Sequence, residues 1–288
     1  MFYRHAELKS LRHNPFNIFQ ENRTPVCLYA RKKWLGLENT LQWKSDYQKT
    51  VSELFRGQCD NGSWNNSLVL TVHRLFGLHL TVRNINSRIE KAFTWLLATD
   101  SFITFDHFFK SKKSKISSKN LHNIPFTHGC SEHFSKGAIL FLATIFGKDE
   151  DERVLSMYEK LRILGEKRNG KWCDWSCSNN IFRAFAVHPG FGLSRATRMA
   201  VGRLSDVQGE NGTWTRQIPF YQTVNALAHV GFKNADSQLR RAFQTLVTMQ
   251  QRDGTWGKRH KEWKTFLILH AMKRKNHLLP MESIKDAP

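Results

Sequence analysis

The motif Gln-x-x-x-Gly-x-Trp recurs in this chain at a fixed spacing. Three complete copies, and one copy in which Glu replaces Gln, occupy residues 58–64, 208–214, 250–256 and 166–172. The motif glycines at 170, 212 and 254 follow one another at intervals of 42 residues, and Gly129 precedes them by 41 in a copy that has lost its Trp. A repeat of this length is one supersecondary unit, too small to bury its own apolar face, so the units must stack or close into a ring.

Each repeat has the pattern of a helical hairpin. Residues 219–230 begin with Pro and are followed by Gly231, which predicts a helix over this range. The apolar residues that follow recur at helical spacing and predict a second helix: Leu239, Ala242, Phe243, Leu246 and Met249. Asp-Gly or Asn-Gly then supplies a tight turn into the next Trp. The chain is therefore predicted to be a string of helical hairpins.

The number of hairpins suggests a closed ring. First helices are predicted near 26–37, 66–76, 133–146, 178–188, 219–230 and 261–274. Second helices are predicted near 43–56, 85–98, 151–165, 193–206 and 234–249. Residues 3–12 can supply a sixth helix of the second kind, so that the N-terminus closes the ring against the last hairpin.

These repeats resemble the QW repeat of terpenoid cyclases and protein prenyltransferases. Residues 241–256 follow the family pattern of a basic, a small and an aliphatic residue before Gln-x-x-x-Gly-x-Trp, residues 91–96 match its first half, and 49–64 are a weaker copy. The resemblance covers roughly residues 45–275. It implies an all-α (α/α)6 toroid with parallel inner helices around a cavity. It also implies that the Gln and Trp are structural and tie an outer helix to the start of the next inner helix.

Length and composition predict one large helical domain over residues 1–278, with a basic loop insertion at about 100–124 and a polar tail at 279–288. The sequence has no apolar run of about 18 residues and no signal-peptide pattern at its start, so no transmembrane helix is expected. The five cysteines are odd in number and lack a framework spacing, which is typical of the reducing cytoplasm.

The formal charge of +20 is partly concentrated in residues 110–119. Such charge attracts an anionic membrane surface, a diphosphate substrate or nucleic acid, or it simply favours solubility, because charge alone names no partner. A nucleic-acid partner is disfavoured, since no recognised binding motif accompanies the charge. A peripheral position at the membrane is compatible with this composition.

Cysteines and histidines follow the motif glycine in two neighbouring repeats. Cys173 and Cys177 would share one face of a helix, and the preceding repeat places His128, Cys130 and His133 at the equivalent position. If the repeats pack side by side, these side chains converge on one rim with a composition that suits zinc. Protein prenyltransferases hold zinc with Asp, Cys and His at this rim, although their Asp-x-Cys order is absent here. The predicted ligands are Cys173, Cys177, His128 and Cys130; the alternative is that these residues are small hydrophobes and helix caps.

The acids that the resemblance implies are missing. Class II terpene cyclases protonate an alkene with Asp-x-Asp-Asp, which needs a carboxylic acid kept neutral in an apolar pocket. Neither this motif nor the diphosphate-ionising Asp-Asp-x-x-Asp occurs in the chain. The acidic residues 149–152 are expected to cap an outer helix. Asp174, which closely follows a Gly-x-Trp, is the best single acid, with Glu132 and Glu262 as runners-up.

The predicted catalytic residues are Asp174, Tyr221 and His133, since a histidine can orient or protonate such an acid. An aromatic wall of the kind that stabilises carbocations in cyclases is predicted for substrate binding, comprising Trp175, Phe182, Phe185, Phe220 and Trp263. For each of these aromatic residues, ordinary core packing is the alternative.

Two functions follow from this interpretation. The first is a cyclase-like or prenyl-transferring enzyme that acts on an isoprenoid or another apolar polyene in a central cavity. The alternative is a non-catalytic toroid that binds a lipid, an isoprenoid or a peptide and docks on an anionic membrane, while a scaffold with a filled centre is a third possibility. Because many family cyclases pair two barrels and prenyltransferases need a helical subunit, a partner domain or subunit is also considered.

Overall fold

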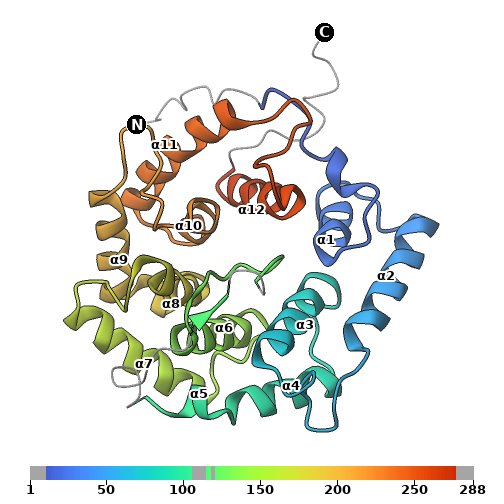
Figure 1. Cartoon of the computed structure of the whole chain (residues 1–288), viewed down its shortest axis with the longest axis horizontal. Helices are drawn as coiled ribbons and strands as arrows, with labels where there is room; N and C mark the ends of the chain where they lie inside the picture. The colour runs from blue at the N-terminus through green and yellow to red at the C-terminus, as the bar shows by residue number, and fades with distance from the viewer. Residues whose placement is uncertain (1–10, 106–114, 118–120, 277–288) are drawn as a thin grey trace.

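The computed structural model describes residues 11–105, 115–117 and 121–276. The chain is all-α, with its helices in an inner and an outer layer around a ring (Figure 1). The inner helices are α1 (Pro25–Lys33), α3 (Leu68–Thr81), α6 (Ser131–Ile145), α8 (Trp175–Val187), α10 (Phe220–Leu227) and α12 (Lys261–Arg274). The outer helices are α2 (Leu41–Phe55), α4 (Ser87–Leu97), α5 (Asp100–Ile103), α7 (Glu152–Lys167), α9 (Arg195–Asp206) and α11 (Lys233–Met249).

The inner layer closes on itself, because each inner helix contacts the next and α12 contacts α1. The predicted helices from 26–37 to 261–274 are present with shifted ends. Five short elements of the described residues were not predicted: α5, the 3-10 turns η1 (Asn17–Phe19) and η4 (Phe191–Leu193), and two antiparallel strands, β1 (Lys115–Ile116) and β2 (Gly129–Cys130).

Three of the motif tryptophans anchor the start of an inner helix to the outer helix before it. The indole N–H of Trp172, Trp214 and Trp256 donates to the carbonyl of Leu161, Leu204 and Leu246, respectively, at 2.7–2.8 Å. Each carbonyl belongs to the outer helix that precedes the motif, and each indole is buried. A buried indole therefore has its donor satisfied while its ring covers the joint.

The motif glutamines make a different connection from the predicted one. Gln58 Nε2 donates to the carbonyl of Gly62 and to that of Arg88 in α4, and Gln208 makes the same pair of bonds, the second of them to Gln238 in α11. The resemblance implied a bond between the preceding outer helix and the start of the inner helix. Each of these two glutamines instead joins its own turn to the outer helix that follows.

The last motif closes the ring on the N-terminal segment. Gln250 Nε2 donates to the carbonyl of His13 at 2.9 Å, and its Oε1 accepts from the amide of His13 at 3.1 Å. A Cβ at Gly254 would overlap the main chain of Asn14, as Cβ atoms at Gly62, Gly170 and Gly212 would overlap the main chain of an outer helix. The segment that contains His13 and Asn14 thus occupies the position that an outer helix has at the other motifs. The predicted helix at 3–12 lies outside the described residues, except for residues 11 and 12, which are not helical.

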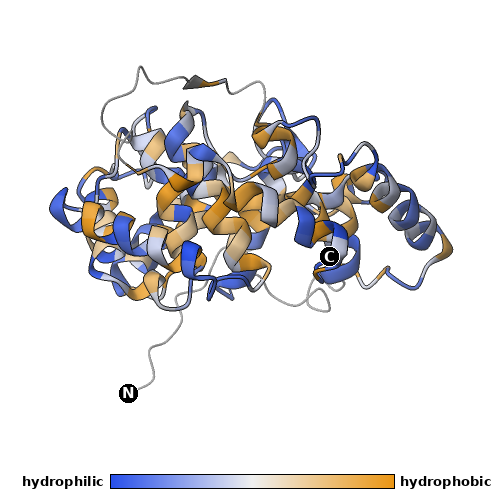
Figure 2. Cartoon of the chain, turned by 90° about the horizontal axis from the view of Figure 1, so that it is seen from below, coloured by the Kyte–Doolittle hydropathy of each residue, from blue (hydrophilic) through white to orange (hydrophobic). Residues whose placement is uncertain are grey.

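Aromatic side chains from inner helices that are not neighbours meet within the ring. Phe76 of α3 packs edge-on against Trp263 of α12 with ring centroids 5.8 Å apart, although α1 lies between these helices in the ring order. Trp263 stacks on Phe266, and Phe76 also approaches Phe141 of α6. Apolar residues concentrate in the middle of the molecule, with hydrophilic residues on its periphery (Figure 2). Across the described ranges, we find no helix with the length and apolar character that crossing a membrane requires.

Candidate metal centre and adjacent pocket

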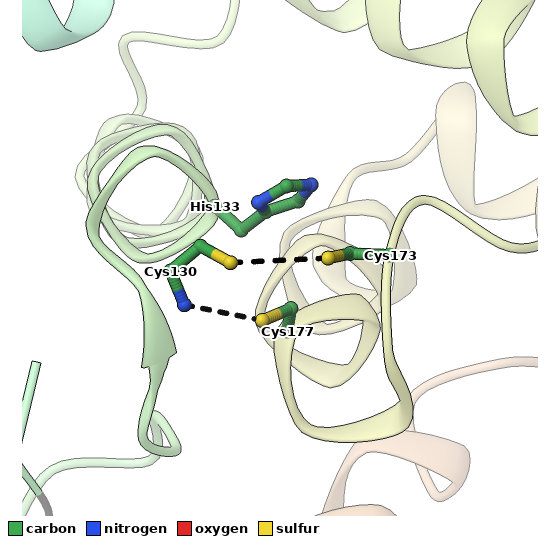
Figure 3. Close-up of side chains that lie close together, drawn as sticks. All are labelled: Cys130, His133, Cys173 and Cys177. Carbon is green, nitrogen blue, oxygen red and sulfur yellow. Dashed lines mark hydrogen bonds between the residues drawn. The ribbon is translucent and has the colours of Figure 1, made fainter. Parts of the chain in front are cut away.

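Four potential metal ligands converge where α6 and α8 begin. They are Cys130, His133, Cys173 and Cys177, whose ligand atoms all lie within 4.8 Å of one another (Figure 3). Cys130 directly precedes α6, Cys173 lies in the bend before α8, and the other two side chains project from the first turns of these helices. Because both inner helices start just after a motif glycine and pack against each other, the repeat itself brings the four side chains together.

The chain approaches the sulfur atoms closely. Cys130 Sγ lies 3.9 Å from Cys173 Sγ, and the amide of Cys130 donates to Cys177 Sγ at 3.2 Å. A Cβ at Gly129 would fall only 2.5 Å from Cys177 Sγ. The motif glycine of this repeat therefore permits the close approach of β2 to the cysteine of α8.

A backbone carbonyl sets the orientation of the histidine. His133 is buried, and its Nε2 lies 3.3 Å from the carbonyl oxygen of Trp172. A carbonyl only accepts hydrogen bonds, so Nε2 carries the proton and the neutral ring has its lone pair on Nδ1. A hydrogen bond from one ring nitrogen to a carbonyl is the usual way in which a protein fixes the tautomer of a metal-binding histidine.

The surroundings of Cys177 favour its neutral thiol. The hydrogen bond with Cys173 and burial raise the pKa of the Cys177 thiol well above its ordinary value. This thiol therefore keeps its proton in the absence of a cation, whereas a divalent cation inverts the preference and binds the thiolate. Three sulfurs and one imidazole nitrogen make a composition that fits a closed tetrahedral metal site. The residues present thus fit a metal ion such as zinc.

The structure corrects the predicted ligand set at one position. Cys130, Cys173 and Cys177 lie in the cluster, whereas His128 is exposed and is not part of it. His133, which was predicted as a catalytic residue, is the fourth member. The prediction that the two later cysteines share one helix face is wrong, because α8 begins at Trp175 and Cys173 lies before it.

The predicted acids do not occupy an apolar pocket. Asp174 is the exposed N-cap residue of α8 and makes no capping hydrogen bond. Glu132 forms a 2.7 Å ion pair with the buried ammonium group of Lys136. Asp151, from the acidic run, is the N-cap residue of α7 and accepts a bond from the amide of Arg153, which confirms the predicted capping role.

The predicted aromatic wall is dispersed. Tyr221 and Phe220 are half-buried in the first turn of α10, and Trp175 lies in that of α8. Phe182 is buried within α8. Phe185 packs against the rings of Tyr158, Trp172 and Phe191, the kind of core packing that was the alternative for this residue. Trp263 is buried at the centre, against Phe76.

A pocket of about 560 Å³ lies beside the N-terminal ends of α1 and α3. Helix α1 has nine residues and α3 has fourteen, so α1 is shorter by about 7 Å and leaves space at its start. The side chains that form the apolar part of the pocket are Pro25, Val26, Leu54, Val69, Leu70, Phe76 and Leu80. Its polar part comprises Thr24, Ser67, His73, Arg74, His122 and Asn123.

The pocket was not among the sequence predictions, which placed the cavity wall on α8, α10 and α12. None of the described residues that line it is acidic, but Thr24 Oγ1 donates to a carboxylate oxygen of Glu262 at 2.5 Å. Phe76, which lines the pocket, links it to Trp263 at the centre of the ring. The missed signal was at the other end of α1, where Thr24 caps the helix and Pro25 is its first residue, so that the helix starts beside the pocket.

Comparisons with known proteins identify a fold. No known family and no curated protein matches the sequence. A crystal structure of a protein from Actinoplanes matches with a TM-score of 0.54 at 17% identity, over 87% of this chain and 89% of that one. An Arg-to-Ala variant of the type II terpene cyclase MstE from Scytonema, in complex with its substrate geranylgeranyl dihydroxybenzoate, matches with a TM-score of 0.53 at 11% identity, over 89% and 87%. The chain thus has an all-α fold similar to that of a type II terpene cyclase.

Proposed function

We propose that this chain is an (α/α)6 toroid, built from repeats of about 42 residues, that binds an apolar isoprenoid-like molecule beside α1 and α3. The observation that carries this proposal is the pocket of about 560 Å³, a volume within the range of small-molecule sites. Its apolar part favours burial of a hydrocarbon chain, by roughly 25 cal/mol for each Å² of apolar surface removed from water.

The distribution of polar groups supports a ligand with a polar head. Arg74, His73 and His122 lie among the polar lining residues, whereas Leu54, Leu70 and Leu80 lie among the apolar ones. MstE, whose fold is similar, holds a substrate that combines a geranylgeranyl chain with a polar aromatic head. A molecule of this general form suits the pocket, with its chain against the leucines and its head near the basic residues.

Zinc is the metal that best suits the cluster of Cys130, His133, Cys173 and Cys177. Three thiolates and one imidazole are typical of structural zinc sites, which are four-coordinate and leave no position for a substrate. The role that we propose for the metal is therefore structural, in contrast to the catalytic zinc of the protein prenyltransferases that the repeats resemble.

A second candidate function, an isoprenoid-processing enzyme, is favoured by Glu262. Its carboxylate accepts hydrogen bonds from Thr24, which lines the pocket, and from Asn22. This places an acid one hydrogen bond away from a bound molecule. If the protein is such an enzyme, Glu262→Gln should abolish turnover of a polyene while its binding persists.

Binding of geranylgeraniol, measured by calorimetry and native mass spectrometry, tests the main proposal. Val69→Trp places a large side chain in the pocket and should weaken binding by more than about tenfold, because the ligand and the indole compete for one volume. Leu155→Trp, on the exposed surface of α7, is the matched control and should bind as the unaltered chain does. Absence of binding, or equal binding by both variants, would refute the proposal.

A further inference from the structure

The segment of residues 121–130, here called the cover segment, joins the pocket to the metal cluster. Its first residues, His122 and Asn123, line the pocket, and its last residue, Cys130, belongs to the cluster. In Figure 1 this segment lies across the inside of the ring of inner helices. Since the two sites lie at opposite ends of ten consecutive residues, a change in the position of one end affects the other.

The cover segment is attached to different sides of the ring at its two ends. The ring of His122 stacks on that of His260, the N-cap residue of α12, with centroids 5.1 Å apart. At the other end, Thr127 exchanges main-chain hydrogen bonds with the Asn180 side chain of α8, and its hydroxyl donates to the carbonyl of Ser176. The segment therefore spans from α12 and α3 to α6 and α8.

The middle of the cover segment connects its two ends firmly, because its side chains are packed. Ile124 and Phe126 are each 1% exposed, and Phe126 packs edge-on against Phe134 and Phe141 of α6. A stretch that is both hydrogen-bonded and packed moves as a unit more readily than a solvated loop does.

We infer that metal bound at the Cys/His cluster holds the cover segment against the pocket, so that metal occupancy and ligand binding are coupled. This inference rests on the proposed binding function. Metal ligation fixes Cys130 beside α8 and thereby orders the residues that lead to the wall formed by His122 and Asn123. Without the metal, a ligand must order this wall itself, and its affinity falls. By reciprocity, a bound ligand must raise the affinity of the cluster for the metal by the same factor.

Calorimetry with geranylgeraniol on zinc-loaded, chelator-stripped and zinc-restored protein tests the coupling. We expect the stripped protein to bind about tenfold more weakly, within the usual range of coupling between two sites, and restored zinc to recover the affinity. Circular dichroism checks that the stripped chain keeps its helices. Equal affinity in all three states would overturn the coupling and leave the binding function intact. Absence of binding to the zinc-loaded protein would refute the binding function itself, and the coupling with it.

The effect of the ligand on zinc affinity tests the same coupling even if the chelator-stripped chain unfolds. Zinc affinity is measured by competition with a chromophoric chelator, with and without saturating geranylgeraniol, and should rise about tenfold with the ligand. Thr127→Val, which removes the hydroxyl bond to Ser176 but touches neither metal nor pocket, should reduce this factor while zinc still binds. Ser237→Ala on α11 is the control and should leave it unchanged. An unchanged zinc affinity in the presence of ligand would overturn the coupling.

Discussion

Two kinds of joint hold successive repeats together in this molecule. Before α10 and α12, the Trp of the motif bonds a main-chain carbonyl of the preceding outer helix, and the Gln bonds a carbonyl of α11 before α10 and that of His13 before α12. Before α6 and α8 the Gln is absent. In the joint before α6, Ser131 also stands where the repeat has Trp, and in the joint before α8, Glu166 stands where it has Gln. The Cys/His cluster lies between these two helices. The comparison teaches that metal-binding side chains occupy the joints in which the Gln of the repeat is missing.

Among the substitutions considered, removal of a metal ligand should lower the free energy of unfolding most, and it distinguishes the joints that hold the cluster from the Gln–Trp joints. Cys177→Ser should lower the free energy of unfolding of the zinc-saturated protein by about 4 kcal/mol, the stabilisation that a ligand at one thousand times its dissociation constant supplies. Cys59→Ser alters a cysteine in a Gln–Trp joint and should change stability by less than about 1 kcal/mol. Urea unfolding with and without zinc measures both values. A similar loss in the two variants would remove the distinction between the joints.

Acid should destabilise the part of the ring that contains the Gln–Trp joints, through a buried histidine of α12 that is not part of the Cys/His cluster. Burial, with Arg274, Arg183 and Arg83 nearby, lowers the pKa of His270 to about 4. The unfolded chain therefore binds the proton first, so stability is complete above about pH 6.5 and falls as the pH approaches 4, by about 3 kcal/mol.

His270→Gln should remove this part of the pH dependence, whereas His122→Gln, at an exposed position, should retain it. His79, whose pKa burial also lowers to about 4, preserves some of the slope in both variants. Urea unfolding at several values between pH 7 and pH 4.5, compared with the unaltered chain, measures the difference. Identical slopes in the two variants would contradict the assignment.

The motif glycine should be sensitive to substitution because of close packing as well as conformation. Gly212 has a φ of +73°, and a Cβ there would overlap the main chain of Arg241, whereas Gly36 has a φ of +65° and open space. Gly212→Ala should therefore cost about 2 kcal/mol more than Gly36→Ala, because both introduce backbone strain but only the first introduces overlap. Thermal unfolding of the two variants tests this, and equal shifts would show that the packing is unimportant.

Substitution at the contact that closes the ring, between the last motif and the N-terminal segment, should have the smallest effect on stability. Gln250→Leu removes the hydrogen bonds that join the last turn to His13 and should lower stability by about 1 kcal/mol. Amide hydrogen exchange should increase selectively in residues 13–19. Exchange that increases equally in α8 would mean that this glutamine stabilises the ring as a whole.

The period of 42 residues predicted the helices well, because Gly-x-Trp marks the start of an inner helix and a glycine or breaker marks its end. It also placed three of the four cluster residues. The register at the start of α6 could not be predicted, because β2 carries the chain past Gly129 and places His133, rather than His128, beside the sulfurs. The pocket was missed since it depends on the short length of α1 and on the path of residues 121–130. Docking on an anionic membrane and a partner subunit stay predictions.

The central claim is that a metal at the Cys/His cluster replaces the Gln–Trp joint. Zinc K-edge X-ray absorption on the purified chain, with metal quantified per chain, tests it most directly. We predict one zinc per chain, with three sulfur ligands at about 2.3 Å and one nitrogen at about 2.0 Å, and loss of this signal in Cys177→Ser but not in Cys59→Ser. A chain that binds no zinc under metal-replete conditions, or binds it through oxygen ligands unaffected by Cys177→Ser, would contradict the account.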